Sequence, residues 1–375
     1  MEFACPKNQL QNAIHHAERS ISSRNTLPVL SNLLFEVNSD ILKVSGTDME
    51  IGIEKKVKVD SAQQGSVLIN SKTISGIVNK LPDANVTLKV LDNNVIEIKC
   101  EQVNFTIHGL PSEEFPQIPK IKDGSSIKVN KDIFKELIKQ TIISVSIDES
   151  KHILNGVMVE FNNDSITGVA TDGYRLSLKE TKGKYEINDK IQMIIPTKAL
   201  NELATIFSDN DDQDIKVNFS DSLASFTCGD FYLSTRIIKG QYPDYQQVVP
   251  KEIKTELNID KDQLVSALER CAVIASSSAN IVKIEVLENQ LLIRANTPDV
   301  GNVNELIDIQ KNNDEKIQIS LNVRLVLEAL KIIKSSKINL SLIDALKPGI
   351  IKPVSNKDDS NFLYVIMPIR TSDHN

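Results

Sequence analysis

The feature that most constrains the fold of this chain is an internal repeat. Segments with helix-start signals recur at Lys72, Lys198 and Arg324, and both intervals are 126 residues. A unit of this length can bury a core of its own, unlike the shorter unit of a solenoid, which depends on its neighbours. The 375-residue chain is therefore predicted to contain three similar globular domains arranged in tandem.

Each repeat is predicted to combine two helices with antiparallel strands. Apolar residues recur every three or four positions in residues 7–21, 131–143 and 261–275, as in amphipathic helices. Alternating, β-rich sequence follows the two helices of each repeat, at residues 32–37, 86–90, 95–99, 156–161, 215–218, 225–228, 282–286, 291–294, 338–342 and 362–367. This pattern predicts an α+β fold with three copies of a two-helix, antiparallel-sheet domain. Linker-like sequence rich in proline, lysine and polar residues sets the expected domains at 1–120, 126–250 and 255–375.

Charge is distributed unevenly along the sequence. The net charge of −7 argues against a nucleic-acid partner, because binding to a phosphate backbone requires a basic surface. The six predicted helical segments nevertheless carry +7 together, which leaves −14 for the rest. If these helices share one face, that face can hold duplex DNA through its phosphates without reading bases. Helices that simply carry lysines on their solvated sides explain the same count, and the sequence alone leaves both interpretations open.

Motifs for catalysis or cofactor binding are not found in the sequence. There is no glycine-rich phosphate loop, HExxH motif or GxSxG motif. The cysteines at positions 5, 100, 228 and 271 form no CxxC pair and are predicted to be reduced and partly buried. The sequence therefore predicts no cofactor, no metal and no catalytic residue. The absence of a signal peptide and of an apolar run long enough to span a bilayer predicts a cytoplasmic protein.

Two other classes of function remain open at this point. A metal-dependent nuclease or hydrolase could use Asp48 and Asp172, which lie in repeated Thr-Asp turns, although an aspartate there more commonly caps the turn. A cytosolic scaffold of repeated domains that never contacts DNA is the second possibility.

Several segments resemble the bacterial sliding clamp family, the β subunit of the replicative DNA polymerase III. They are residues 25–30 (NTLPVL), 154–156 (LNG), 170–177 (ATDGYRLS), 240–245 (GQYPDY) and 364–370 (YVIMPIR). The resemblance covers essentially the whole chain. It implies a non-catalytic processivity factor in which two chains join head to tail as a six-domain ring around duplex DNA. Helices would line the central hole, and the ring would slide through non-specific phosphate contacts while it tethers the polymerase.

The resemblance also implies a cleft between the second and third domains. This cleft would bind short peptides of the replicative polymerase α subunit, the clamp loader and other DNA-processing proteins. The matching positions are Leu154, Thr171, Gly173, Tyr174, Arg175, Leu176, Pro243, Gln247, Val248, Asn322, Val365, Met367, Pro368 and Ile369. Gln247 departs from the family pattern, because relatives often have a basic residue there. Leu176 and Val365 can equally be read as ordinary core residues.

The remaining site predictions concern DNA and the second chain. Arg24, Lys151 and His152 match DNA-contacting loops of the family, whereas charge and repeat position add Lys72, Lys198 and Arg324. At the dimer contact, Phe105 and Ile107 are expected to meet Val273 and Ile274 of the second chain. Glu305 remains there, but the other charged pairs of some relatives are depleted. We therefore predict a homodimer held mainly by apolar burial, with weak sensitivity to salt.

Overall fold

The structure is a computed structural model that describes residues 1–22, 27–121, 125–187, 189–208, 212–277, 279–313, 315–354 and 361–370. It forms two compact units, which are described separately below. The first unit contains Met1–Asp132 and Lys198–Ile237, and the second contains Ile133–Thr197 and Ile238–Asn375.

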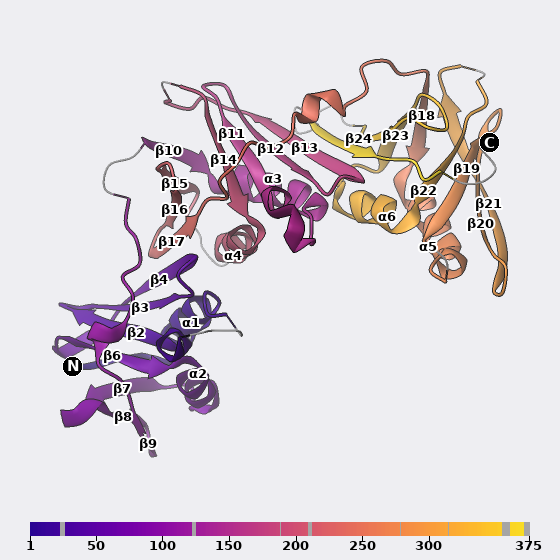
Figure 1. Cartoon of the computed structure of the whole chain (residues 1–375). Helices are drawn as coiled ribbons and strands as arrows, with labels where there is room; N and C mark the ends of the chain where they lie inside the picture. The colour runs from indigo at the N-terminus through magenta and orange to yellow at the C-terminus, as the bar shows by residue number, and fades with distance from the viewer. Residues whose placement is uncertain are drawn as a thin grey trace. The chain divides into compact units, whose positions relative to one another are not determined.

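The order of helices and strands repeats three times along the chain (Figure 1). The first repeat contains β1 (Glu2–Pro6), α1 (Lys7–Glu18), β2 (Asn32–Asn38), β3 (Ile41–Thr47), β4 (Ile51–Lys58), β5 (Asp60–Gln63), β6 (Gly65–Asn70), α2 (Ser71–Lys80), β7 (Asn85–Val90), β8 (Val95–Cys100) and β9 (Val103–His108). The second contains β10 (Ser125–Asn130), α3 (Lys131–Thr141), β11 (Gly156–Phe161), β12 (Ser165–Thr171), β13 (Arg175–Lys182), β14 (Ile191–Pro196), α4 (Thr197–Ser208), β15 (Asp214–Phe219), β16 (Leu223–Cys228) and β17 (Phe231–Arg236). The third contains β18 (Thr255–Asp260), α5 (Lys261–Ala275), β19 (Ile281–Val286), β20 (Gln290–Thr297), β21 (Gly301–Lys311), β22 (Gln318–Asn322), α6 (Val323–Ile332), β23 (Lys337–Leu342), β24 (Gly349–Pro353) and β25 (Phe362–Ile366). The predicted α+β class with two helices in each repeat is confirmed.

Antiparallel pairing joins consecutive repeats into continuous sheets. In the first unit, β17 of the second repeat pairs with β4 of the first, so that one sheet runs β10-β15-β16-β17-β4-β3-β2-β6. A second sheet of this unit has the order β5-β1-β7-β8-β9. In the second unit, β25 of the third repeat pairs with β13 of the second, within the order β14-β11-β12-β13-β25-β24-β23-β18-β21-β20-β19-β22. The same kind of junction therefore occurs twice.

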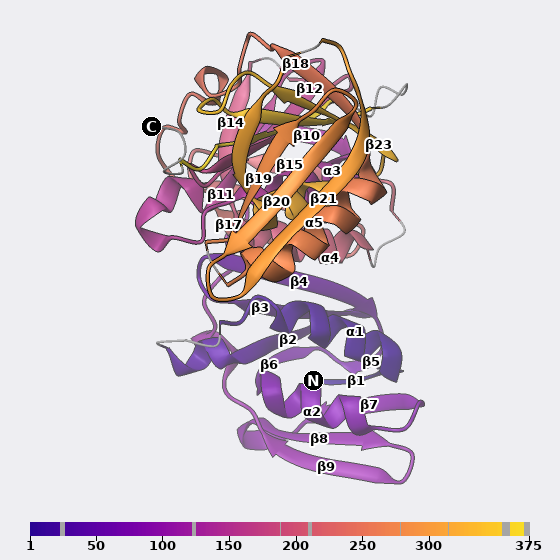
Figure 2. The ribbon, with the colours of Figure 1, turned by 90° about the vertical axis from the view of Figure 1, so that its right-hand side faces the viewer.

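The helices cover apolar faces of these sheets, as their amphipathic pattern predicts. In the first unit, α1 and α2 pack against each other, and α1 also packs on β3 and β4 (Figure 2). Leu10, Ile14 and Ala17 of α1 are fully or almost fully buried in this core. In the second unit, α5 packs on β20 and β21 and against α6. Each core is therefore closed on one side by a pair of helices.

Local signals explain where several helices begin. The Asn70 side chain accepts a hydrogen bond from the Thr73 amide at the start of α2, and Asn322 accepts from the amides of Arg324 and Leu325 at the start of α6. Asp260 caps α5 in the same way. These side chains satisfy amides that have no partner inside the helix.

Three helices end earlier than the sequence predicts, and this changes the distribution of charge. α1 ends at Glu18 rather than residue 21, α3 at Thr141 rather than 143, and α6 at Ile332. Arg19, Lys334 and Lys337 consequently lie outside the helices. The six helices then carry a net charge of +4 instead of the +7 counted from the sequence. No helix of the described residues is long and apolar enough to cross a membrane.

Candidate functional site

A small apolar cluster lies where the second and third repeats meet in the second unit. β13 and β25 pair so that Leu176 faces Val365 across the ladder, and both side chains are almost completely buried. Met158, Ile194 and Tyr242 belong to the same cluster. Leu154 is partly buried and packs against it. Leu176 and Val365 therefore contribute to the core, and their place at the base of a cleft stays a prediction.

Large apolar side chains remain exposed around this cluster. Tyr174 is 66% exposed, Val248 41% and Met367 38%. The Met367 amide donates a hydrogen bond to the Tyr174 carbonyl, which holds the two segments together. Such apolar side chains can bury additional surface only against a ligand or another chain, and methionine adapts to ligands of varied shape. These side chains can therefore form an apolar docking surface.

The Thr-Asp turn before β13 carries four of the residues predicted to line the cleft, from Thr171 to Arg175. The Asp172 carboxylate accepts hydrogen bonds from the amides of Tyr174 and Arg175, at 2.8 and 3.1 Å. Thr171 donates its hydroxyl to the Arg175 carbonyl, and its own amide donates to the Tyr242 hydroxyl. Gly173 adopts a φ of 95°, which an L side chain rarely permits. The turn thus lifts Tyr174 to the surface.

The same arrangement occurs in the first repeat and bears on the nuclease interpretation. Asp48 accepts from the amides of Glu50 and Ile51, at 3.0 and 2.9 Å. Asp48 and Asp172 therefore act as turn caps. Among the residues that the structure describes, no group of three or more His, Cys, Asp or Glu side chains is placed to hold a metal ion.

Arg175 connects the two repeats that flank the cleft. Its Nε donates to Asp172 Oδ2 at 3.0 Å, and its Nη1 donates to Glu328 Oε2 on α6 at 2.5 Å. Burial lowers the pKa of Arg175, but Tyr364 and the Glu328 carboxylate outweigh this effect and raise the pKa above its usual value. With only 9% of its side chain exposed, Arg175 is primarily a brace between Asp172 and Glu328.

The other predicted cleft residues also lie in the second unit. Pro243, Gln247 and Val248 are exposed in the segment after β17, where Gln247 donates to the Asp244 carboxylate at 2.9 Å. Asn322 caps α6. Pro368 and Ile369 follow β25 and are partly buried, and the Ile369 amide donates to the Ser320 carbonyl. The structure thus places all fourteen predicted residues in one unit, and their role in ligand binding stays a prediction.

The residues predicted to contact DNA differ in how free their charges are. Lys72 is exposed on α2, and no ion pair joins it to another residue of the described ranges. Lys198 donates to Asp48 at 2.5 Å and to the Ser20 carbonyl at 3.1 Å, so much of its charge is already compensated. Arg24 lies outside the described residues. The clearest cationic candidate of the first unit is therefore Lys72.

In the second unit, the predicted DNA contacts are partly engaged as well. Lys151 donates to the Asp172 carbonyl at 3.1 Å and lies 5.5 Å from the centre of the Tyr174 ring. His152 is exposed in the same loop. Arg324 is 75% exposed on α6, although its Nε donates to Glu328 at 3.1 Å.

Residues predicted at the dimer contact lie on β9, on β21 and on α5. β9, which carries Phe105 and Ile107, is the last strand of its sheet. β21 carries Glu305, and α5 packs on it with Val273 70% exposed and Ile274 partly buried. Glu305 accepts two hydrogen bonds from Arg270, at 2.6 and 2.8 Å. The sequence reasoning missed Leu306, which is 54% exposed on β21 and could have been found from its alternation with buried Ile307.

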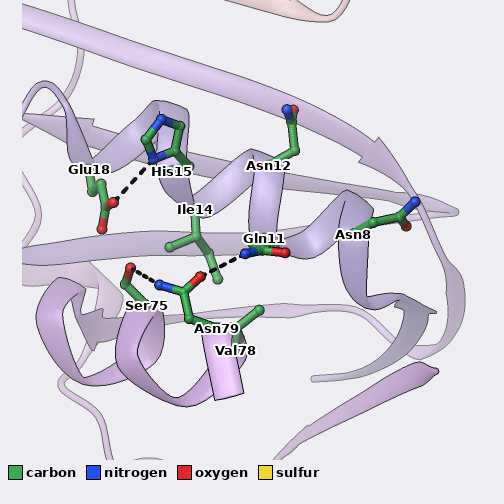
Figure 3. A pocket seen from close by; sticks show the side chains of 9 residues that line it. All are labelled: Asn8, Gln11, Asn12, Ile14, His15, Glu18, Ser75, Val78 and Asn79. Carbon is green, nitrogen blue, oxygen red and sulfur yellow. Dashed lines mark hydrogen bonds and ion pairs between the residues drawn. The ribbon is translucent and has the colours of Figure 1, made fainter. Parts of the chain in front are cut away.

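A polar groove is lined by side chains of α1 and α2, which pack against each other (Figure 3). Its volume is about 310 Å³, and Asn8, Gln11, Asn12, His15, Glu18 and Asn79 line it. Gln11 Nε2 donates a hydrogen bond to Asn79 Oδ1 at 2.8 Å, and His15 Nδ1 lies 3.5 Å from Glu18 Oε1. The groove therefore offers mainly neutral hydrogen-bonding groups.

Three repeats of one two-helix, antiparallel-sheet fold, joined through continuous sheets, define the class of protein as a three-domain clamp. Residues 1–119, 128–244 and 246–370 match the N-terminal, central and C-terminal domains of the DNA polymerase III beta subunit. The chain belongs to this family, the bacterial sliding clamps, and is a non-catalytic processivity factor rather than an enzyme.

Individual relatives agree along the whole length. The beta sliding clamp of Bacillus subtilis is 28% identical over 381 residues, which cover 99% of this chain and 100% of the relative. The beta sliding clamp of Streptococcus pneumoniae is also 28% identical, with the same coverage. Among solved structures, the beta subunit of Streptococcus pyogenes has a TM-score of 0.94 at 26% identity and covers 99% of this chain and 100% of its own. A Pseudomonas aeruginosa sliding clamp bound to griselimycin has a TM-score of 0.93 at 25% identity, with the same coverage of both chains.

Proposed function

We propose that two copies of this chain close into a ring around duplex DNA and tether the replicative polymerase. The proposed domains are residues 1–120, 126–250 and 255–375, so that the ring contains six. The observation that carries this proposal is the repeated junction between sheets. At each junction, the last strand of one repeat pairs with the fourth strand of the repeat before it, as β17 does with β4 and β25 with β13.

The same rule leaves one strand at each end of the chain without its counterpart. These strands are β9, the last of the first repeat, and β21, the fourth of the third repeat. β21 pairs with β20 at residues 301–308, but within the described residues its second edge is paired with β18 only at residues 309–311. An open strand edge readily pairs with another chain. Two chains joined head to tail satisfy both edges at once and form a closed assembly.

Apolar side chains near these edges support the same closure. Phe105 on β9 is 36% exposed, whereas Val273 and Leu306 are 70% and 54% exposed beside the open edge of β21. Arg270 neutralises Glu305 within the chain. The interface is accordingly proposed to depend on apolar burial.

The proposed contact with DNA is weak and independent of sequence. Lys72, Arg324, Lys151, His152, Lys198 and Arg24 would contact phosphates, and several of these charges are shared with carboxylates or carbonyls. A low net attraction to phosphates suits a ring that must slide, since the closed ring keeps the protein on the duplex. Because DNA is the proposed site of action, we place the protein in the cytoplasm.

The cleft is proposed to bind short peptides of the polymerase α subunit, the clamp loader and other DNA-processing proteins. Leu176 and Val365 form its floor, and Tyr174, Val248 and Met367 provide surface for an apolar side chain. We expect griselimycin to bind there as well. Met367→Lys should weaken griselimycin binding, because it places a charge in the apolar surface.

Retention on circular DNA tests the ring directly. The protein is loaded onto nicked circular DNA with a clamp loader and ATP, and the circle is then linearised. We expect retention on the circle and release from the linear form, because linear ends allow the ring to slide off. Equal retention on both forms would contradict enclosure, and no retention on either would favour the scaffold interpretation.

A further inference from the structure

Glu328 lies between two arginines, the nearly buried Arg175 of β13 and the exposed Arg324 of α6. Its Oε2 accepts from Arg175 in the cleft wall at 2.5 Å, and its Oε1 accepts from the exposed Arg324 at 3.1 Å. Asp172 holds the other side of the Arg175 guanidinium. A continuous chain of ion pairs therefore runs from the surface of α6 to the Thr-Asp turn of the cleft.

We propose that Glu328 is a positioning residue for the cleft, which braces Arg175 and transmits phosphate binding at Arg324 to cleft affinity. This inference rests on the proposed function, since it takes Arg324 to contact DNA and the cleft to bind partners. Arg175 comes from the second repeat, whereas Glu328 comes from the third. Their bond consequently fixes the two walls relative to each other.

The first turn of α6 is tied to the cleft by two further contacts. Asn322, a predicted cleft residue, caps α6 by accepting from the amides of Arg324 and Leu325. The hydroxyl of Tyr364 on β25 donates to the Leu325 carbonyl at 2.9 Å. Arg324 is thus an exposed cation on a fixed segment, because its side chain reaches solvent while its backbone is held.

The direction of the effect follows from the sharing of one carboxylate. A phosphate competes with Glu328 for Arg324, because guanidinium groups form strong bonds to phosphate. Glu328 then interacts with Arg175 alone and strengthens the brace. A more rigid cleft loses less freedom when a ligand binds, so phosphate at Arg324 should tighten ligand binding. By linkage, a ligand in the cleft should tighten phosphate binding equally.

Fluorescent griselimycin and a short linear DNA duplex at low salt test this coupling in the full-length protein. We expect the duplex to tighten griselimycin binding to the unaltered protein by about 5-fold, within the usual range for coupled sites. Glu328→Gln should weaken griselimycin by about 10-fold and abolish the response to duplex, because it removes one charge-assisted bond of the brace. Arg324→Ala leaves Glu328 to Arg175 alone, so it should tighten griselimycin binding to about the level that duplex produces in the unaltered protein and should lose the response to duplex.

Glu269→Gln is the matched control, since Glu269 also pairs with a cation of α6, Lys331 at 3.5 Å, but has no bond to Arg175. It should leave both affinity and response unchanged. A Glu328→Gln protein that keeps its affinity and its response to duplex would overturn the inference while leaving the clamp function intact. If the unaltered protein binds neither griselimycin nor duplex and is not retained on circular DNA, the proposed function fails, and the inference fails with it.

Discussion

Val273 offers the sharpest test of ring closure, because it is 70% exposed in the single chain. Full burial of a valine side chain contributes about 1.5–3 kcal/mol, so covering the exposed part contributes roughly 1–2 kcal/mol at each interface. A closed dimer contains two such interfaces, which gives roughly 2–4 kcal/mol. Val273→Asp removes this contribution and also requires a charge to be desolvated. We expect the dimer dissociation constant to rise at least about 30-fold, since each 1.4 kcal/mol is tenfold.

Sedimentation velocity over a dilution series measures this change. Leu346→Asp is the control, because Leu346 is 54% exposed in a loop outside β21 and α5. It should leave the dimer intact. Equal dissociation constants for Val273→Asp and the unaltered protein would refute this interface. Dissociation of the unaltered dimer by salt alone would refute apolar burial as its main source of stability.

Three further predictions concern stability and reactivity. Gly46→Ala should lower the free energy of unfolding by about 1–3 kcal/mol in chemical denaturation, because its Cβ would lie 2.4 Å from the Ala17 carbonyl oxygen on α1; an unchanged midpoint would contradict this packing. Burial raises the pKa of Cys5 to about 12 and that of Cys271 to about 11. Both thiols should therefore react with a thiol reagent at pH 8 only after denaturation. Rapid labelling of the native protein would contradict this expectation. Burial raises the pKa of Glu328, but the hydrogen bonds from Arg175 and Arg324 outweigh burial and lower this pKa overall. The ionised carboxylate therefore stabilises the folded protein above the unfolded pKa of about 4.3, and this stabilisation is lost as pH falls further. Glu328→Gln should therefore flatten the acid side of the melting-temperature profile, and an unaltered profile would contradict this.

Sequence reasoning predicted the fold well because its signals are local and repeat three times. The amphipathic period located the first helix of each repeat, and Asn70 and Asn322, which stand at the predicted starts of two second helices, are real caps. The interval of 126 residues located the second helix of each repeat. Helix ends were predicted less well, since Ile21 and Lys334 continue the apolar or cationic pattern beyond the last helical residue. Composition does not reveal where the backbone leaves the helix.

Pairing between distant side chains could not be predicted in the same way. Lys198 and Asp48 lie 150 positions apart in the sequence, and Arg175 and Glu328 lie 153 apart. Neither pair follows from helical or strand periodicity, because each depends on how two repeats are joined. The sequence could name Arg175 as a cleft residue by resemblance, but not its role as a brace.

These distant pairs also change how the charge of the protein is understood. A count of lysines and arginines on helices implies a strongly basic surface, yet Lys198, Arg270 and Arg324 each share their charge with a carboxylate. Each shared cation must give up part of an existing bond before it can hold a phosphate, so its net gain from DNA is small. A surface of this kind cannot hold DNA tightly through affinity. Under the proposed closure, long residence on DNA comes from the ring, and the apolar contact at Val273 on α5 then contributes more to function than any single cation.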